Sequence, residues 1–257
     1  MNSEPEITFI EVNSENVEEY GLCCVVNRKS AGFKTKLNWF RDVLNQGLLI
    51  VIAVDSTDYK QLGFVEFTDS ELAWRPVTAD NHLFIHCITV FSKAFRNQDI
   101  GSKLIQYCEQ LAIDSGKDGM CTMSSDGTWM AGRKLFEKNG FKIIDRADRF
   151  ELLQKSLNGN SSTPRFNDWK AQLAKYQGWN IVYSDQCPWH IKSVTDISEY
   201  AREIGLDMQI TKLATPLEAQ QSPSLYGTFS LIKDGILLED HYISKTRFIN
   251  ILKKESE

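Results

Sequence analysis

The sequence lacks two features that would direct it to a membrane or to a polyanion. No window of the 257 residues approaches the roughly 18 apolar residues of a membrane span, and the opening MNSEPEITFIEV has no basic run followed by an apolar stretch. The formal net charge of −5 gives no general attraction to nucleic acid or to an acidic membrane surface. We therefore expect a cytoplasmic protein with neither partner, in which any anion is bound by local groups.

Cysteine and histidine are also too sparse to indicate a secreted or metal-binding protein. The six cysteines follow no disulfide framework, and Cys87, Cys108 and Cys121 lie in apolar stretches, as small core residues do. We expect the adjacent Cys23 and Cys24 to pack against the core as well. The sequence therefore predicts no disulfide and no metal site.

Length and composition predict two domains. A chain of 257 residues suits two compact units, and the segment KSLNGNSSTPR has almost no apolar content and collects Asn, Gly, Ser and Pro, as linkers do. We expect a first domain over 1–155, a linker over 156–165 and a second domain over 166–257.

The periodicity of apolar residues predicts a mixed α/β first domain. Alternating or continuous apolar runs predict strands, and apolar residues at helical spacing predict helices. The expected strands are Ile7–Val12, Leu48–Val54, Leu62–Thr68, His82–Val90, Met120–Ser124, Phe141–Asp145 and Asp148–Leu153. The expected helices are Lys36–Asn45, one with apolar residues from Leu104 to Ala112, and Trp129–Asn139.

The same patterns predict a smaller α/β arrangement after the linker. The expected order is a helix with Phe166, Trp169, Leu173 and Tyr176 on one face, strand Asn180–Ser184, helix Ile191–Ile204, strand Met208–Leu213, hairpin strands Thr228–Lys233 and Ile236–Tyr242, and a closing helix.

One strand–loop–helix segment has the pattern of a phosphate site. In IHCITVFSKAFRNQDIGSKLIQYCEQLA, Arg96 and Gly101 flank the start of the helix. A helix begins with unpaired N–H groups and the positive end of its dipole, so a glycine-containing turn there can hold a pyrophosphate. The alternative is an ordinary helix start with Ser102 near its cap.

This segment resembles the coenzyme-A-binding motif (Gln/Arg-x-x-Gly-x-Gly/Ala) of the GNAT acetyltransferases. The resemblance covers about residues 5–153 and includes LFEKNGF, which is similar to the family's Leu-Tyr-x-x-x-Gly-Phe pattern. ELAWRPV followed by ADNHLFIHCITV resembles the YoaP-like acetyltransferases, which carry a short additional C-terminal domain. The resemblance implies a GNAT fold, acetyl-CoA as cosubstrate, and a small-molecule or peptide amine as acceptor.

The resemblance also implies which residues bind the cofactor. Ile88 and Val90 would hold the pantetheine arm, Val90 through backbone groups, while the pyrophosphate would be surrounded by Arg96, Asn97, Gln98, Gly101 and Ser102.

Two positions depart from the family pattern. Asp99 stands where the family has its first glycine, and a carboxylate beside phosphates is unfavourable unless it turns away or meets a cation; Lys93, Arg96 and Lys103 are the expected cations. Phe136 stands where many relatives have a tyrosine that is proposed to protonate the departing thiolate.

His86 and Glu66 are the candidates for accepting the acceptor's proton. His86 lies four residues before Val90, where relatives often carry a catalytic glutamate, and imidazole titrates near neutral pH. The alternatives are a hydrogen-bonded strand histidine and a carboxylate on the sheet surface, and a water-mediated base is also compatible with the sequence. By the same resemblance Trp74 and Arg75 would lie near the acceptor pocket; otherwise they are surface residues.

The second domain resembles thioredoxin in the order of its elements. Strand NIVYSDQ precedes Cys187-Pro188-Trp189-His190 and a helix, but His190 stands where a dithiol carrier has its second cysteine, and Gly227 where thioredoxins have a cis-proline. Cys187 at a helix start, with His190 one turn on, would have a lowered thiol pKa. A reactive thiol, a Cys187/His190 pair that contributes half of a metal site, and an inert inherited scaffold are all compatible with this pattern.

The preferred hypothesis is an acetyl-CoA-dependent N-acetyltransferase. A thiol-based binding or redox protein centred on Cys187 and a non-catalytic module that binds coenzyme A are the alternatives. The loops that select the acceptor carry no readable code in this superfamily, so the acceptor and the oligomeric state are left open.

Overall fold

The computed structural model describes residues 6–25, 27–91, 95, 98–159 and 162–255. They form two compact units, and each unit collects segments that are far apart in the sequence. The first unit contains residues 1–26, 40–73 and 77–166. The second contains residues 27–39, 74–76 and 167–257. None of the described helices is both long and apolar enough to cross a membrane.

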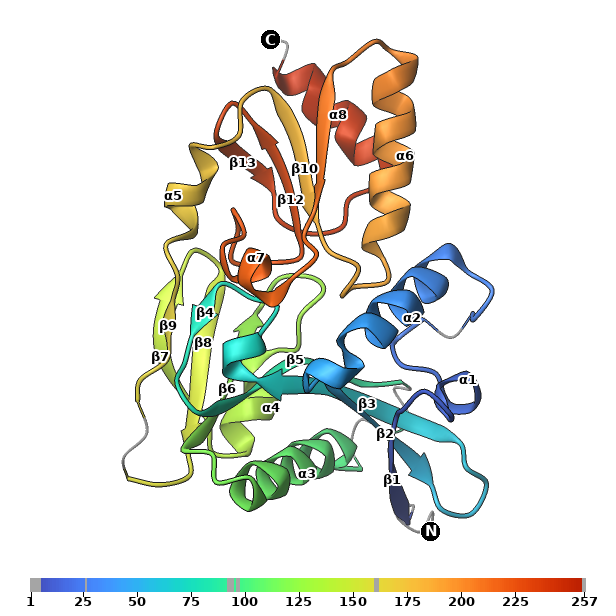
Figure 1. Cartoon of the computed structure of the whole chain (residues 1–257), viewed down its shortest axis with the longest axis vertical. Coiled ribbons are helices and arrows are strands. Elements are labelled where there is room, and N and C mark those ends of the chain that lie inside the picture. Colours follow the sequence, from blue (N-terminus) through green and yellow to red (C-terminus); the bar gives the residue numbers. More distant parts are fainter. Residues whose placement is uncertain (1–5, 26, 92–94, 96–97, 160–161, 256–257) are drawn as a thin grey trace. The chain divides into compact units, whose positions relative to one another are not determined.

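A seven-stranded sheet forms the centre of the first unit (Figure 1). Its strands lie in the order β1-β2-β3-β5-β6-β8-β7. Their bounds are β1 Ile7–Glu11, β2 Leu49–Asp55, β3 Gln61–Asp69, β5 His82–Val90, β6 Gly119–Ser125, β7 Lys142–Ala147 and β8 Phe150–Ser156. Neighbouring strands are antiparallel, with the exception of the parallel pair β5 and β6.

The other elements of the first unit lie between these strands or after them. They are α1 Val17–Tyr20, η1 Leu44–Gln46, η2 Ser70–Leu72, α3 Ile100–Asp114, α4 Arg133–Lys138 and the two-stranded pair β4 Val77–Thr78 and β9 Arg165–Phe166. Helix α2, Ala31–Val43, runs from the second unit into the first.

Helix α3 packs on one face of this sheet because its apolar residues recur at helical spacing. Leu104, Ile105, Cys108 and Ala112 are completely buried and join a core cluster with Val65 and other residues of the central strands. Burying one such leucine or isoleucine stabilises the fold by about 1.5–3 kcal/mol. This packing fixes the start of α3 relative to the central strands.

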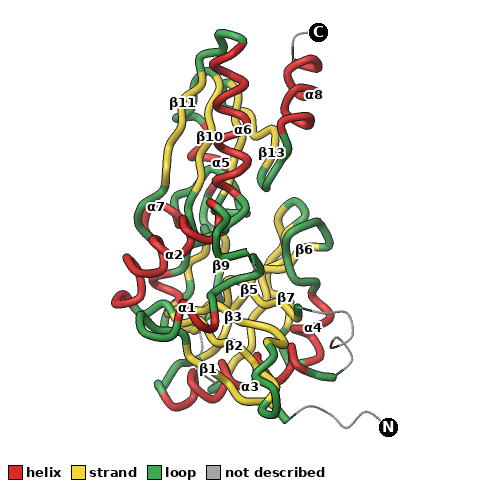
Figure 2. Tube along the Cα trace, turned by 90° about the vertical axis from the view of Figure 1, so that its right-hand side faces the viewer, coloured by secondary structure: helices red, strands yellow, loops and turns green. Residues whose placement is uncertain are grey.

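A four-stranded sheet organises the second unit, in the order β11-β10-β12-β13. Strands β10 and β11 are parallel, whereas β12 is antiparallel to both β10 and β13. Its elements are α5 Trp169–Leu173, β10 Trp179–Tyr183, α6 His190–Glu203, β11 Met208–Lys212, α7 Pro216–Gln220, β12 Phe229–Lys233, β13 Ile236–Glu239 and α8 Lys245–Glu255. Helix α6 lies along β10 and β11 in both ribbon views (Figures 1 and 2).

Most expected elements of both units are present, and the differences have local causes. The expected helix over 129–139 is wrong in its first turn, because Trp129 has a φ of 73°, which no helical residue adopts, and α4 begins only at Arg133. Helix α2 begins at Ala31, before the expected Lys36. Helix α7 was not expected, although Thr215 and Glu218 form the capping box that signals its start.

Candidate active site

The central strands β5 and β6 separate partway along their length. Their parallel pairing runs from His82 with Gly119 to Ile85 with Thr122 and goes no further among the described residues. At this last pair the Thr122 hydroxyl donates to the Ile85 carbonyl at 2.9 Å. Beyond it, β5 pairs on its other side only, with β3 as far as Val90. Beyond Ile85, this edge of β5 therefore has no described strand partner, and a strand edge of this kind is where a ligand can bind to the backbone.

We call the point where the pairing of β5 with β6 ends the fork, and a β-bulge places His86 there. In the pairing of β3 with β5, Phe67 faces Ile85 and Glu66 faces Cys87, so His86 is the additional residue. The bulge changes which residues share a face, because Leu83 and Ile85 join the α3-side core and the next residue to do so is Ile88. Strand alternation alone would place His86 and Val90 on the same face of β5, but the bulge shifts the alternation between them.

The bulge brings His86 and Glu66 together. His86 Nδ1 lies 3.7 Å from Glu66 Oε1, and the side chains are 0% and 2% exposed. The Phe84 ring lies 5.2 Å from the imidazole. Both sequence candidates for the base are thus one buried pair. The alternative that Glu66 is a carboxylate on the sheet surface is wrong, because its side chain is buried.

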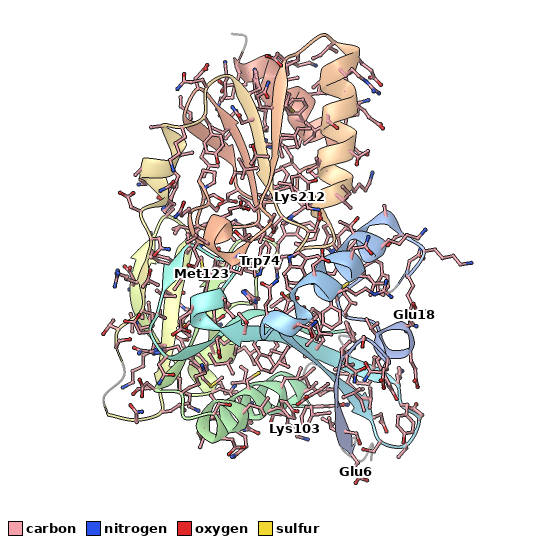
Figure 3. All side chains as sticks on the ribbon, viewed as in Figure 1. Glu6, Glu18, Trp74, Lys103, Met123 and Lys212 are labelled. Atoms are coloured by element: carbon pink, nitrogen blue, oxygen red, sulfur yellow. The ribbon has the colours of Figure 1, made fainter. Side chains whose placement is uncertain are left out.

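The start of α3 forms the second part of the site. Asp99 is the residue before the helix, with a left-handed φ of 54°, and its side chain makes no capping hydrogen bond to α3. Its carboxylate is exposed and forms an ion pair with Lys138 of α4. The hydrogen bond from Lys138 lowers the pKa of this carboxyl, and Lys103, labelled in Figure 3, contributes through its charge. From the sequence we expected Lys103 as a cation near Asp99, but not Lys138, a basic residue in the last turn of α4.

Other predicted cofactor residues surround the same turn. Gln98 Oε1 is buried without a hydrogen-bond partner, and the Ser102 hydroxyl accepts a 3.1 Å hydrogen bond from Asn139 Nδ2. Gly101 faces Leu135, because a Cβ at residue 101 would lie 3.1 Å from Leu135 Cδ1. Ile88 and Val90 lie on β5 beyond the fork. The predicted residues Arg96 and Asn97 and the expected cation Lys93 fall outside the described residues.

Phe136 is part of the core. Its side chain is 1% exposed and packs edge-on against Phe141, with ring centroids 5.6 Å apart. An apolar side chain in this environment has no proton to give, so Phe136 fills space and takes no part in acid catalysis.

Trp74 and Arg75 belong to the second compact unit. Both are buried, so the alternative that they are surface residues is wrong (Trp74 is labelled in Figure 3). Arg75 Nη1 donates to the Trp74 carbonyl at 2.8 Å and to Gln186 Oε1 at 3.2 Å. The backbone of Gly227 packs against the same loop, because a Cβ there would lie 3.1 Å from the Trp74 carbonyl oxygen.

The Cys187 motif lies at the start of α6 in the second unit. Cys187 is partly exposed and forms no disulfide. His190 is completely buried, its Nδ1 lies 3.3 Å from the Ser184 carbonyl oxygen, and burial lowers its pKa to about 3. A neutral imidazole lends no positive charge to a thiolate. The expected role of His190 in lowering the thiol pKa is therefore contradicted.

No group of three or more His, Cys, Asp or Glu residues that could hold a metal ion occurs in the part of the chain that the structure describes. The β5–β6 fork offers the backbone of β5, the buried His86–Glu66 pair and the start of α3.

Comparisons with known proteins give similar sequences and structures over the whole chain and over part of it. The chain is 26% identical over 250 residues to the uncharacterized N-acetyltransferase YoaP of Bacillus subtilis (strain 168), covering 95% of this chain and 98% of that protein. A GNAT-family acetyltransferase from Staphylococcus aureus Mu50 is 19% identical with a TM-score of 0.43, over 60% of this chain and 100% of that one. The PaiA N-acetyltransferase of Thermoplasma acidophilum, solved with coenzyme A, is 15% identical with a TM-score of 0.44, over 59% of this chain and 99% of that one.

The family assignment follows from the segment that contains the fork. The model of the Acetyltransferase (GNAT) family matches residues 14–141, which include β5, β6, the start of α3 and all of α4. This segment belongs to the GNAT family, and the protein is an acetyltransferase.

Proposed function

We propose that the protein transfers an acetyl group from acetyl-CoA to a primary amine of a small molecule or peptide, at the β5–β6 fork. The observation that carries the proposal is the coincidence at His86 of three features: the end of strand pairing, the β-bulge and the buried contact with Glu66. Bulges beside active sites redirect side chains, and open strand edges offer backbone partners to a ligand.

Acetyl-CoA would bind along the open edge of β5 and at the start of α3. Backbone groups of Ile88 and Val90 would hold the pantetheine arm, as a strand partner would. The first turn of α3, with Gln98, Gly101 and Ser102, would hold the diphosphate through N–H groups and the helix dipole. Arg96 and Asn97, outside the described residues, keep their proposed role at the same diphosphate.

The His86–Glu66 pair would take the proton that the amine must lose. Glu66 lies beside Nδ1 of His86 and would stabilise the positive charge that the imidazole gains when it accepts the proton. Because both side chains are enclosed, the proton would reach them through a water molecule. The departing coenzyme A thiolate needs no acid from position 136, since a thiol with a pKa of about 8.5 is a good leaving group. Buried Trp74 and Arg75 are left outside this mechanism.

Acetyl transfer to a panel of amines tests this function, with Glu66→Gln as the informative variant. We expect the wild-type protein to acetylate at least one amine, and Glu66→Gln to lower kcat by about 100-fold, the usual contribution of general base catalysis. Mass spectrometry of the products gives the rates, and calorimetric titration of acetyl-CoA shows whether the variant keeps its cofactor site.

Two results would contradict the proposal. Wild-type protein that binds acetyl-CoA and acetylates nothing would favour a non-catalytic coenzyme A module. Glu66→Gln protein with wild-type kcat would remove the buried pair from the mechanism.

We also propose that the C-terminal part, residues 166–257 after a 156–165 linker, is a thioredoxin-like domain. The strand order β11-β10-β12-β13 and the Cys187 loop between β10 and α6 support this proposal. A cytoplasmic location is supported by six cysteines, none of which forms a disulfide. The neutral state of His190 argues against a strongly activated thiol at Cys187.

A further inference from the structure

Residues of α4 and its C-cap contact the start of α3 at three positions. Lys138 forms an ion pair with Asp99, Leu135 lies against Gly101, and Asn139 donates to the Ser102 hydroxyl. Residues three and four apart lie on one face of a helix, so Leu135, Lys138 and Asn139 form a single face. The geometry of the turn is therefore set by α4 as well as by α3 itself.

The Asp99 carboxylate makes no hydrogen bond to the N–H groups of the first turn of α3. An aspartate before a helix ordinarily accepts hydrogen bonds from N–H groups of the first turn. Here the side chain makes no such bond and is held by Lys138 instead. The backbone stays in register with the helix, because the Asp99 carbonyl accepts from the Lys103 N–H at 2.9 Å. The N–H groups at the start of α3 are thus left without a competing internal anion.

We propose that Lys138 is a positioning residue for coenzyme A, which holds the Asp99 carboxylate away from the diphosphate end of α3. The inference rests on the proposed function, because it takes the start of α3 as the diphosphate site. It explains how the chain tolerates an acidic residue at a position where the family has glycine. The positive charge of Lys138 on α4 offsets the unfavourable effect of the Asp99 carboxylate on a nearby diphosphate.

The Michaelis constant for acetyl-CoA tests this role with three variants. Lys138→Gln releases the carboxylate, so we expect KM to rise about 5- to 10-fold, as for a misplaced charge at a helix end, with kcat within about twofold of wild type. Asp99→Asn removes the charge and keeps a side chain that tolerates the left-handed backbone, so its KM should stay at or below the wild-type value. In Asp99→Asn/Lys138→Gln, the rise caused by Lys138→Gln should disappear.

A matched control separates this effect from a general loss of positive charge. Lys134 lies on the same helix and is exposed, so Lys134→Gln makes the same charge change and should leave KM unchanged. Because Lys138 and Asp99 are both largely exposed, all variants should fold, which thermal unfolding checks.

The outcomes distinguish this inference from the function on which it rests. A double variant whose KM stays raised would show that Lys138 contacts the cofactor directly and would overturn the positioning role. Lys138→Gln with the KM of Lys134→Gln would also overturn it while leaving the acetyltransferase function intact. Wild-type protein with no saturable response to acetyl-CoA would overturn the proposed function and the inference together.

Discussion

His190 carries a measurable consequence for stability at the scale of single residues. It is completely buried, and burial lowers its pKa to about 3 from an ordinary value near 6.5. Between these two pH values, His190 is therefore protonated in the unfolded chain and neutral in the folded chain. Since the unfolded state binds more protons, stability rises with pH across this window and falls as the solution is acidified.

We predict that wild-type protein loses about 2 kcal/mol more unfolding free energy than His190→Gln between pH 7.5 and pH 5, at about 1.4 kcal/mol per pKa unit. Denaturant unfolding of both proteins at the two pH values measures this difference, and the other titrating groups, common to both, cancel. An equal loss in both proteins would mean that His190 is accessible to protons in the folded state.

The residue types of the candidate site could be predicted from sequence, but their arrangement could not. His86 and Glu66 were both identified as candidates, yet as alternatives, because the sequence holds no sign of the bulge that pairs them. Asp99 was recognised as a charge in need of a cation. Lys138 was missed because it lies 39 positions away, and that contact depends on how α4 packs on α3.

Helix α2 gives a prediction at the scale of elements, because its Gly32 has a role that sequence rules misjudge. Replacing a glycine inside a helix with alanine ordinarily stabilises it by about 0.5–1 kcal/mol. Here a Cβ at residue 32 would lie 2.2 Å from the Pro188 carbonyl oxygen, a backbone atom of the Cys187 loop in the same unit.

We therefore expect Gly32→Ala to destabilise the protein by about 1–3 kcal/mol, the usual cost of overpacking. Chemical denaturation monitored by circular dichroism measures the change. Gly132→Ala is a useful comparison, because nothing lies within 4 Å of the position of its Cβ. A Gly32→Ala protein as stable as the wild type would show that the Pro188 loop can move aside at little cost.

Elements were predictable where one periodicity is sustained. Strand β5 has the expected bounds His82–Val90, and α3 contains the expected apolar stripe from Leu104 to Ala112, because both bury a continuous apolar face. The start of α4 was misplaced because Trp129 and Met130 contribute apolar character to a segment whose backbone is not helical. Apolar composition alone does not report a positive φ.

At the scale of the whole molecule, the sequence predicts two units but not their membership. Composition shows where the chain becomes polar after β8. It cannot show that residues 27–39 and 74–76 join the second unit, because that membership depends on contacts such as Lys36 Nζ to the Gln186 carbonyl at 2.6 Å, 150 positions apart. The transferase chemistry is assigned to the first unit, where the fork, the buried pair and the start of α3 all lie.

Hydrogen–deuterium exchange with and without saturating acetyl-CoA tests this assignment most directly. We expect acetyl-CoA to slow exchange in peptides covering residues 86–91 and 98–104, because the ligand would occupy the open edge of β5 and the first N–H groups of α3. Unchanged exchange in both peptides, or protection confined to residues 184–190 around Cys187, would contradict it.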